Sequence, residues 1–330
     1  MKLLSLVTGA AGFIGSHLVD RLLAEGHRVI GIDNFLSGNP QNISHLADEK
    51  SFEFRKLDIC DHDALSHAMH GVDHVFHIAG IGDIVPSIEA PLDYHRSNVD
   101  GTVSCLEAAR ANGIGRFLYA ASSTCYGIPT TYPTPEDHPI RLEYPYALTK
   151  HIGEEIVLHW GKVYGLSVAS LRLFNVYGPR SRTNGAYGAV FGVFLAQKRA
   201  GRPFTVVGDG EQTRDFTYVS DVVDAFLTVS KSGLTGEAVN VGSGGTYSIN
   251  HLVQLLGGEK INLPKRPGEP DQTFADVSRI EGATGWRAKV RFEEGVQRML
   301  EHIDYWQDAP IWTPETIANA TSGWFKYLTK

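Results

Sequence analysis

Tyr146 and Lys150 are the two residues whose types and spacing most directly suggest chemistry. If residues 143–150 are helical, the phenol and the ammonium lie one turn apart on the same face. A nearby positive charge favours phenolate, so it can lower the pKa of a tyrosine from about 10 towards the working pH. Such a tyrosine accepts a proton from an alcohol. Taken alone, the pair is also compatible with an exposed helical turn.

Hydroxyl side chains precede this pair at the end of a predicted strand. The apolar run 116–121 predicts a buried strand, and Ser122, Ser123 and Thr124 follow it. Parallel α/β sheets bind their ligands at the carboxyl ends of the strands, so these hydroxyls could face a substrate. They could also bond to the local backbone. The Tyr–Lys pair downstream favours the first interpretation.

The N-terminal stretch has the pattern of a dinucleotide-binding turn. Residues 3–7 predict a buried strand, Gly9, Gly12 and Gly15 come next, and a helix is predicted over 17–23. Gly9 would make the tight turn, Gly12 would let backbone amides approach a pyrophosphate, and Gly15 would allow close helix–strand packing. The phosphates would lie at the helix N-terminus, where free N–H groups and the helix dipole favour anions.

A second predicted strand, over 28–32, ends at Asp33. A carboxylate at this point can accept hydrogen bonds from an adenosine ribose and would repel a 2′-phosphate. The sequence therefore predicts NAD rather than NADP as the cofactor.

Strands and helices alternate through the first half of the chain. The further predicted strands cover 52–57, 72–77, 116–121 and 167–171, and the long predicted helices cover 92–111 and about 145–164. This order predicts an α/β fold of the Rossmann type, with a doubly wound parallel sheet. Asp58 and Ile59 could border the adenine and Ala79 the diphosphate, while Asn98 is the polar residue of its helix expected to face inwards.

The alternation breaks down after about residue 172. Glycine, proline and charged residues gather in 208–216 and again in 265–270. We expect a dinucleotide-binding domain over 1–172 and a smaller, mostly substrate-binding C-terminal domain over 173–330. A strand near 238–241 could return to the first domain.

Composition excludes several other classes of protein. The 330 residues have a formal net charge of −7, and no long basic run points to nucleic acid. Cys60, Cys105 and Cys125 are too widely spaced for a disulfide framework or a zinc site, so no metal is expected. No apolar run is long enough to span a bilayer, and glycines interrupt the first one too early for a signal peptide. We expect a cytoplasmic enzyme without a nucleic-acid or membrane partner.

The motifs in order identify a family resemblance. They are the glycine turn, Ser122, Tyr146, Lys150, Asn175 and Arg214. Over about residues 2–305 the chain resembles the extended short-chain dehydrogenase/reductases, and most of all the nucleotide-sugar 4-epimerases of the UDP-galactose 4-epimerase type. The resemblance implies tightly held NAD and a UDP-sugar substrate. It also implies a homodimer packed as a four-helix bundle through the helices near 92–111 and 145–163.

The resemblance also implies roles for single residues. Tyr146 would be the acid/base, Lys150 would bond the nicotinamide ribose and lower the tyrosine pKa, and Ser122 would bond the reacting sugar oxygen. The implied cofactor positions are Gly9, Gly12, Phe13, Ile14, Gly15, Asp33, Asn34, Asp58, Ile59, Ala79, Asn98 and Lys150. The implied substrate positions are Ser122, Ser123, Thr124, Tyr146, Asn175, Arg182, Arg214, Arg266, Glu269 and Thr273. For the arginines, surface ion pairing is the alternative.

The implied reaction is inversion at C4 of the sugar through a transient 4-keto intermediate. Related enzymes catalyse 4,6-dehydration or decarboxylation, but Ser123 and Thr124 stand where those enzymes usually carry acidic residues. An NAD-dependent dehydrogenase that releases its redox product is a further alternative. A catalytically silent NAD-binding sensor is another, although it would have no use for an activated tyrosine.

The sugar stays open between hexose, N-acetylhexosamine and uronate. Thr273 aligns with the position that limits C2 substituents, and its small side chain would leave room for an N-acetyl group. Arg182 could pair with the C6 carboxylate of a uronate, or it could point to solvent. The tail beyond Trp312 is expected to pack on the body or on a dimer partner through Ile317, Trp324 and Phe325. No sequence signal supports a role for the tail in substrate closure.

Overall fold

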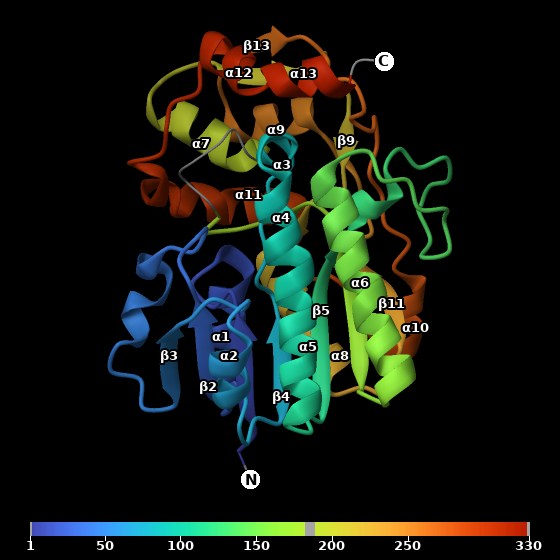
Figure 1. The fold of residues 1–330 in the computed structure, drawn as a ribbon. Helices are drawn as coiled ribbons and strands as arrows, with labels where there is room; N and C mark the ends of the chain where they lie inside the picture. Colours follow the sequence, from blue (N-terminus) through green and yellow to red (C-terminus); the bar gives the residue numbers. More distant parts are fainter. Residues whose placement is uncertain (1, 182–188, 329–330) are drawn as a thin grey trace.

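A seven-stranded parallel sheet forms the centre of the molecule (Figure 1), which a computed structural model describes for residues 2–181 and 189–328. From one edge to the other, the strands are β11 (Glu237–Val241), β6 (Val168–Leu173), β5 (Arg116–Ser122), β4 (His74–His77), β1 (Leu4–Thr8), β2 (Arg28–Asp33) and β3 (Phe52–Lys56). This confirms the predicted doubly wound α/β class. The strand order reverses between β1 and β4, and ligands of such sheets bind outside the carboxyl ends of the strands at that point.

Helices cover both faces of the sheet (Figure 1). One face carries α2 (His62–Ala68), α5 (Gly101–Ala111) and α6 (Pro145–Tyr164), and the other carries α1 (Phe13–Ala24) and α8 (Val219–Ser230). Because both faces are buried, the inner strands are almost continuously apolar, as the sequence predicted. Within the described residues, no helix combines the length and apolar character that a membrane span requires.

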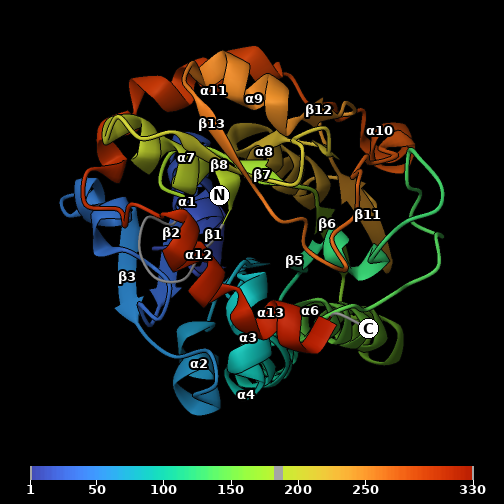
Figure 2. The same cartoon turned by 90° about the horizontal axis from the view of Figure 1, so that it is seen from above.

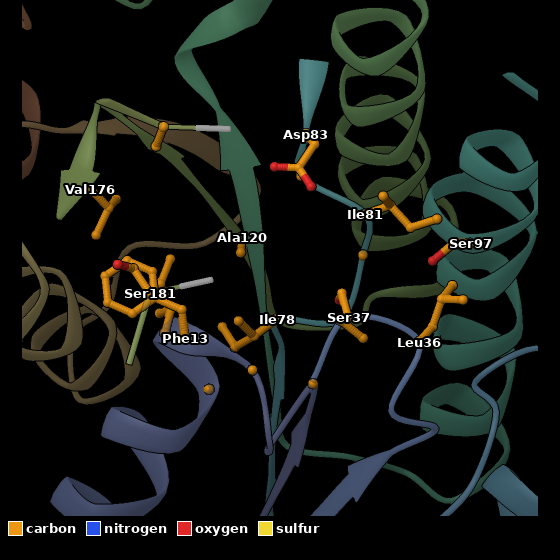
Figure 3. Close-up of a pocket in the computed structure, with 18 of the residues that line it drawn as sticks. Phe13, Leu36, Ser37, Ile78, Ile81, Asp83, Ser97, Ala120, Val176 and Ser181 are labelled. Atoms are coloured by element: carbon orange, nitrogen blue, oxygen red, sulfur yellow. The ribbon is translucent and has the colours of Figure 1, made fainter. Parts of the chain in front are cut away.

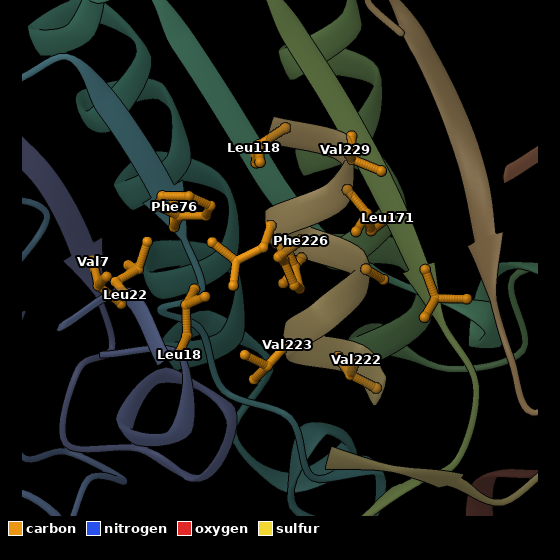
Figure 4. Packing of buried hydrophobic residues seen from close by; sticks show 14 of the residues in the cluster. Val7, Leu18, Leu22, Phe76, Leu118, Leu171, Val222, Val223, Phe226 and Val229 are labelled. Atoms are coloured by element: carbon orange, nitrogen blue, oxygen red, sulfur yellow. The ribbon is translucent and has the colours of Figure 1, made fainter. Parts of the chain in front are cut away.

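Helix α8 shows how the sequence specifies this packing. Its apolar residues at 222, 223, 226 and 229 recur at helical spacing, so they share one face. Figure 4 shows that face packed against Leu118 of β5 and Leu171 of β6, with Leu18 and Leu22 of α1 beside it. The helix lies in the second half of the chain, yet it completes the core under the central sheet.

The two long helices predicted from the sequence form with one irregularity. The first consists of α4 (Pro91–His95), a π-helical turn η2 (Arg96–Asp100) and α5 in direct succession. The second, α6, begins at Pro145, where the missing N–H costs no helical hydrogen bond, and ends at Gly165 with φ 70°. Single π turns often occur at functional sites, and this one contains Asn98.

The remaining elements form a smaller region above the carboxyl ends of the strands (Figure 1). They include α7 (Val190–Arg199), α9 (Ile249–Leu256), α11 (Phe292–Glu301), η4 (Ile303–Trp306) and the strand pairs β7–β10 (Val176–Tyr177, Thr217–Tyr218), β8–β13 (Phe204–Val207, Lys260–Leu263) and β9–β12 (Thr213–Arg214, Tyr247–Ser248). Their shared core is rich in aromatic side chains.

The chain passes between this region and the sheet more than once. Residues 237–241 form β11, which pairs with β6 in parallel register, and α10 (Ser278–Thr284) packs beside β11. The tail ends in α12 (Pro314–Ala320) and α13 (Ser322–Leu328). Seen from above in Figure 2, these two helices run across the top of the molecule, and α13 lies next to α3 (Ile84–Glu89).

Candidate active site

A cavity of about 740 Å³ opens at the carboxyl ends of β1, β4 and β5 (Figure 3). Its walls are the glycine turn after β1, residues 78–84 after β4, the end of β5 and the first turns of α6. The smaller region above the sheet contributes the remaining wall. The cavity therefore lies where the strand order reverses, as expected for this class of sheet.

The glycine turn packs too closely for any larger residue. Gly9 has φ +71°, and a Cβ at Gly15 would lie 2.0 Å from the carbonyl oxygen of Gly9. Helix α1 begins at Phe13, four residues earlier than predicted, with Gly12 in the capping position. No side chain caps this end, where Gly12, Phe13 and Ile14 line the cavity, so its first backbone N–H groups have no side-chain acceptor. The turn is thus open to an anionic group.

Asp33 lies at the end of β2 and lines the same cavity together with Asn34. Its carboxylate accepts hydrogen bonds from the N–H of Ala11 at 3.0 Å and from the N–H of Phe35 at 2.7 Å. Burial raises the pKa of Asp33, and these two backbone bonds oppose the rise. The carboxylate is held in place next to the glycine turn, and it retains acceptor capacity for a ligand hydroxyl.

The other predicted cofactor positions divide into two groups. Asp58, Ile59 and Ala79 line the cavity. Asn98 does not line it; this side chain is buried in the π turn, where it bonds to both the N–H and the carbonyl of Ile81 at 2.8 and 3.1 Å. Its amide thus fixes the backbone of the cavity wall, and a contact between Asn98 and the cofactor stays a prediction.

Tyr146, Ser122 and Lys150 meet in the cavity. Tyr146 lies in the first turn of α6, and Ser122 is the last residue of β5. The Ser122 hydroxyl forms a hydrogen bond with the phenol of Tyr146 and also accepts one from the Thr124 hydroxyl at 2.9 Å. Lys150 follows one turn along α6, and its ammonium lies over the ring of Tyr119, 4.3 Å from the centroid. The strand end and the helix start thus bring the three groups together.

The pKa of Tyr146 shifts in the direction opposite to the sequence expectation. Burial raises it, the hydrogen bond from Ser122 lowers it, and the Asp83 carboxylate adds to the rise. Lys150 is itself buried, and burial lowers its pKa to about 7 against the opposing charge of Glu154. Desolvation is thus the main cause of both pKa shifts. Sequence spacing predicts which charges are near each other but not how deeply they are buried.

A buried ion pair supports the same helix. Glu154, one turn beyond Lys150, binds the guanidinium of Arg172 at 2.7 Å and accepts a bond from the Ser170 hydroxyl at 2.8 Å. Burial alone would raise the pKa of Glu154, but the nearby His151 ring and the bonds from Arg172 and Ser170 outweigh it and hold the carboxyl ionised. The pair ties α6 to β6 behind the cavity.

The predicted substrate positions are only partly brought together. Ser123, Thr124 and Asn175 line the cavity, and the Thr273 hydroxyl donates to the side-chain oxygen of Asn175 at 2.6 Å. Arg182 lies outside the described residues.

Three predicted substrate residues form a separate group beside the cavity. Arg266 pairs with Glu269 at 3.1 Å, and Arg214 bonds to the carbonyl of Thr213 at 2.9 Å. None of these three predicted residues is part of the cavity lining, but the charges of Arg214 and Glu269 act on Tyr144, which directly precedes Pro145. The group therefore lies near the N-terminus of α6.

The sequence analysis missed a contact that joins the two ends of the chain. Tyr305 in η4 donates to the side-chain oxygen of Asn42 at 2.7 Å, and Asn42 donates to the carbonyl of Ala11 at 2.9 Å. Tyr305, Asn39 and Asn42 all line the cavity. No local pattern in the sequence pairs Asn39 or Asn42 with a residue more than 260 positions away.

Asp83 was also missed. Its carboxylate is directed into the cavity from the segment after β4 (Figure 3), and its backbone carbonyl accepts a hydrogen bond from Tyr94 at 2.5 Å. A carboxylate here can accept bonds from sugar hydroxyls. It also makes the cavity less favourable for an anionic sugar ring.

Comparison with known proteins shows the same arrangement elsewhere. Residues 5–242 match the model of the NAD dependent epimerase/dehydratase family. The UDP-glucose 4-epimerase of Mycolicibacterium smegmatis is 37% identical over 305 residues, which cover 90% of this chain and 97% of that protein.

Two solved structures have a closely similar fold. One is UDP-glucuronic acid 4-epimerase from Bacillus cereus with UDP-glucuronic acid and NAD (TM-score 0.85, 32% identity). The other is UDP-N-acetylglucosamine 4-epimerase from Methanobrevibacter ruminantium with UDP-N-acetylmuramic acid (TM-score 0.87, 31% identity). Each match covers 92% of this chain and 99% of the solved chain. The three relatives share C4 chemistry and differ in the sugar.

Proposed function

This chain belongs to the NAD-dependent epimerase/dehydratase family, and we propose that it inverts C4 of a UDP-sugar with Tyr146 as the acid/base. One observation carries this proposal. The Ser122 hydroxyl, the Tyr146 phenol and the Lys150 ammonium reach the same cavity as the glycine turn. A proton-transferring group and a dinucleotide site are therefore adjacent, which is the arrangement that reversible alcohol oxidation requires.

The residues present fit NAD. The uncapped N-terminus of α1 faces the cavity and suits a pyrophosphate, while the fixed Asp33 carboxylate suits an unphosphorylated ribose. Lys150, at the inner end, would bond the nicotinamide ribose. Bound NAD would supply the hydride acceptor for C4.

Tyr146 would take the proton of the 4-hydroxyl and return it to the same oxygen after the 4-keto sugar has turned its other face to the cofactor side. Its raised pKa keeps the phenol protonated in the ligand-free protein, so a donor to the oxygen is needed to favour phenolate. Ser122 already provides such a hydrogen bond. The hydroxyls of Ser123 and Thr124 and the amide of Asn175 would orient the sugar, and Arg214, Arg266 and Glu269 would hold the nucleotide diphosphate end.

Dehydration is the second outcome that the cavity permits. Ser123 and Thr124 offer no carboxyl group, but Asp83 lies in the same cavity and close enough to act on the pKa of Tyr146. A carboxylate beside the sugar ring could move a proton at a neighbouring carbon. A 4-keto product would therefore indicate the dehydratase reaction.

A homodimer is part of the same proposal. Large apolar side chains are exposed on the face formed by α4 and α6, among them Leu92 at 82%, Val163 at 52% and Leu148 at 44%. Figure 1 shows these helices side by side on one face. Pairing of two such faces would bury them as a four-helix bundle. Light scattering on the purified protein would show a mass of one chain if this part is wrong.

The test is a panel of UDP-sugars incubated with the full-length protein without added NAD, with products resolved by NMR. A 4-epimer formed without net NADH supports the proposal, and the responding sugar identifies the C2 and C6 substituents. Tyr146→Phe should lower turnover by about 10²-fold or more, since positioned acid–base groups contribute about 10²–10⁴-fold. Tyr164→Phe, at the exposed end of the same helix, is the control. Near-native turnover in Tyr146→Phe would remove Tyr146 from the mechanism.

A further inference from the structure

The C-terminal tail makes contacts that its sequence does not suggest. From η4 it passes along the cavity, where Ala309, Pro310 and Trp312 form part of the lining. It then crosses the top of the molecule as α12 and α13 (Figure 2). The B. cereus and M. ruminantium enzymes are matched over almost their whole length without using all of this chain. Part of this chain thus has no counterpart in those two structures.

The tail is fixed at several points. The buried amide of Gln197 donates to the carbonyl of Trp312 at 2.8 Å. Thr313 and Thr316 form a capping box at the start of α12. Ile317 is buried in the aromatic core of the smaller region. A chain end held in this way has a defined position relative to the cavity.

Trp324 in α13 is the residue through which the tail reaches the predicted substrate group. Its side chain is 1% exposed, and its indole N–H donates to the carbonyl of Pro267 at 2.6 Å. The guanidinium of Arg266 lies over the indole ring, 5.9 Å from the centroid, and the ring of Tyr144 lies 5.8 Å away. Trp324 thus holds both the side chain of Arg266 and the backbone next to it.

The charges around Arg266 favour an anion. The charges of Arg266 and Glu269 both act on the guanidinium of Arg214, and Arg266 and Glu269 form an ion pair. Lys265 and Asp271 add one charge of each sign and pair with each other. Arg214 bonds to the backbone carbonyl of Thr213 and adds a further positive charge to the group. A diphosphate matches such a group, because arginine donates paired hydrogen bonds to phosphate oxygens.

We propose that the tail is a wall of the substrate site and that Trp324 is a positioning residue, which orients Arg266 for the nucleotide diphosphate. This inference rests on the proposed function for the identity of the ligand. An arginine on a desolvated indole loses much of its rotational freedom, so the guanidinium meets the ligand in one orientation. Without the indole, only the pair with Glu269 would hold the guanidinium of Arg266, which could then turn towards solvent, and ligand binding would have to reorder it.

The test measures UDP binding to the full-length protein with its NAD, by titration calorimetry. UDP probes the nucleotide end without depending on catalysis. Trp324→Ala should weaken UDP binding by about tenfold, since a buried cation–π contact and the ordering of one arginine are lost. KM for the UDP-sugar should rise in proportion, while kcat and the bound NAD stay near the wild-type values. Trp324→Phe keeps a ring under Arg266 but loses the bond to Pro267, so its effect should be smaller.

Ile317→Val is the matched control, because it trims a buried tail residue that packs in the aromatic core rather than on Arg266. It should leave UDP affinity unchanged. Unaltered UDP affinity in a folded Trp324→Ala protein would overturn the inference, and an equal loss in Ile317→Val would show that the tail acts only through stability. If Trp324→Ala does not fold, Trp324→Leu decides, because it fills part of the space without an aromatic face: affinity equal to wild type would refute the role. Absence of UDP binding by the wild type would also refute it.

The two proposals fail in different ways. If UDP binds and depends on Trp324 but no UDP-sugar is epimerised, the proposed reaction is wrong and the role of the tail stands. If sugars are epimerised but Trp324→Ala binds UDP as tightly as the wild type, the reaction stands and the role of the tail is refuted.

Discussion

Replacing Lys150 by methionine should change how the stability of the cofactor-free protein depends on pH. Burial lowers the pKa of this lysine from 10.5 to about 7, a difference of about 3.5. In the unfolded chain the ammonium is solvated and the pKa returns to its ordinary value. Across that interval the unfolded state binds more protons than the folded state, so stability rises with pH. The cost of the buried charge is fully present below pH 7, and it disappears as the pH approaches 10.5.

The magnitude follows from the pKa difference. At ~1.4 kcal/mol for each pKa unit, the buried charge costs ~5 kcal/mol of folding free energy at low pH. Because Lys150 is half protonated near pH 7 in the folded protein, the gain between pH 7 and pH 9 is about 2 kcal/mol. Methionine has a similar length and no charge. Lys150→Met should therefore be more stable than the wild type at pH 7, and this advantage should shrink by about 2 kcal/mol at pH 9.

Urea unfolding of both cofactor-free proteins at several pH values between 6 and 9 measures the difference directly. Other titrating groups occur in both proteins and cancel. Lys162→Met, which removes an exposed lysine from the last turn of the same helix, is the control and should leave the pH dependence unchanged. If the free energy of unfolding changed with pH by the same amount in the wild type and in Lys150→Met, burial would not lower the pKa of Lys150.

Three further changes test other parts of the site. Glu154→Gln breaks the buried pair with Arg172 and should cost about 3–5 kcal/mol in urea unfolding; a loss below 1 kcal/mol would show that the pair is not buried in solution. Gly15→Ala places a Cβ 2.0 Å from a backbone oxygen, so NAD content by absorbance and melting temperature should both fall, and an unchanged protein would contradict the close packing. Tyr305→Phe removes the bond to Asn42, and NAD loss on dialysis should accelerate about fivefold. If Tyr305→Phe retained NAD as long as the wild type, the bond between Tyr305 and Asn42 would have no part in holding the cofactor.

The sequence predicted the parts of the site whose chemistry is local. The glycine turn, Asp33 and the Tyr146–Lys150 pair are each recognisable within one strand–turn–helix unit, and the structure places all of them in one cavity. Helix spacing and strand order are enough for such predictions, because they depend on residues a few positions apart.

Other features depend on contacts that no local pattern records. Tyr305 reaches Asn42 from 263 positions away, and Trp324 reaches Pro267 from 57 positions away. The direction of the Tyr146 pKa shift depends on burial by the whole fold, so the expected lowering was wrong for the ligand-free protein. Asn98 faces inwards, as predicted, and its hydrogen bonds go to the backbone of Ile81 and to the Thr149 hydroxyl.

The late position of β11 in the chain affects how the protein folds during its synthesis on the ribosome. Its partner β6 ends at Leu173 and β11 begins at Glu237, so 237 − 173 = 64 positions separate them. At about 5–20 residues per second, the outer edge of β6 emerges roughly 3–13 s before the strand that covers it. During that time an apolar strand presents unpaired backbone groups, a known template for misassembly between nascent chains. Helix α8 is made within the same interval, so the first half of the chain can complete its fold only after much of the second half has been translated.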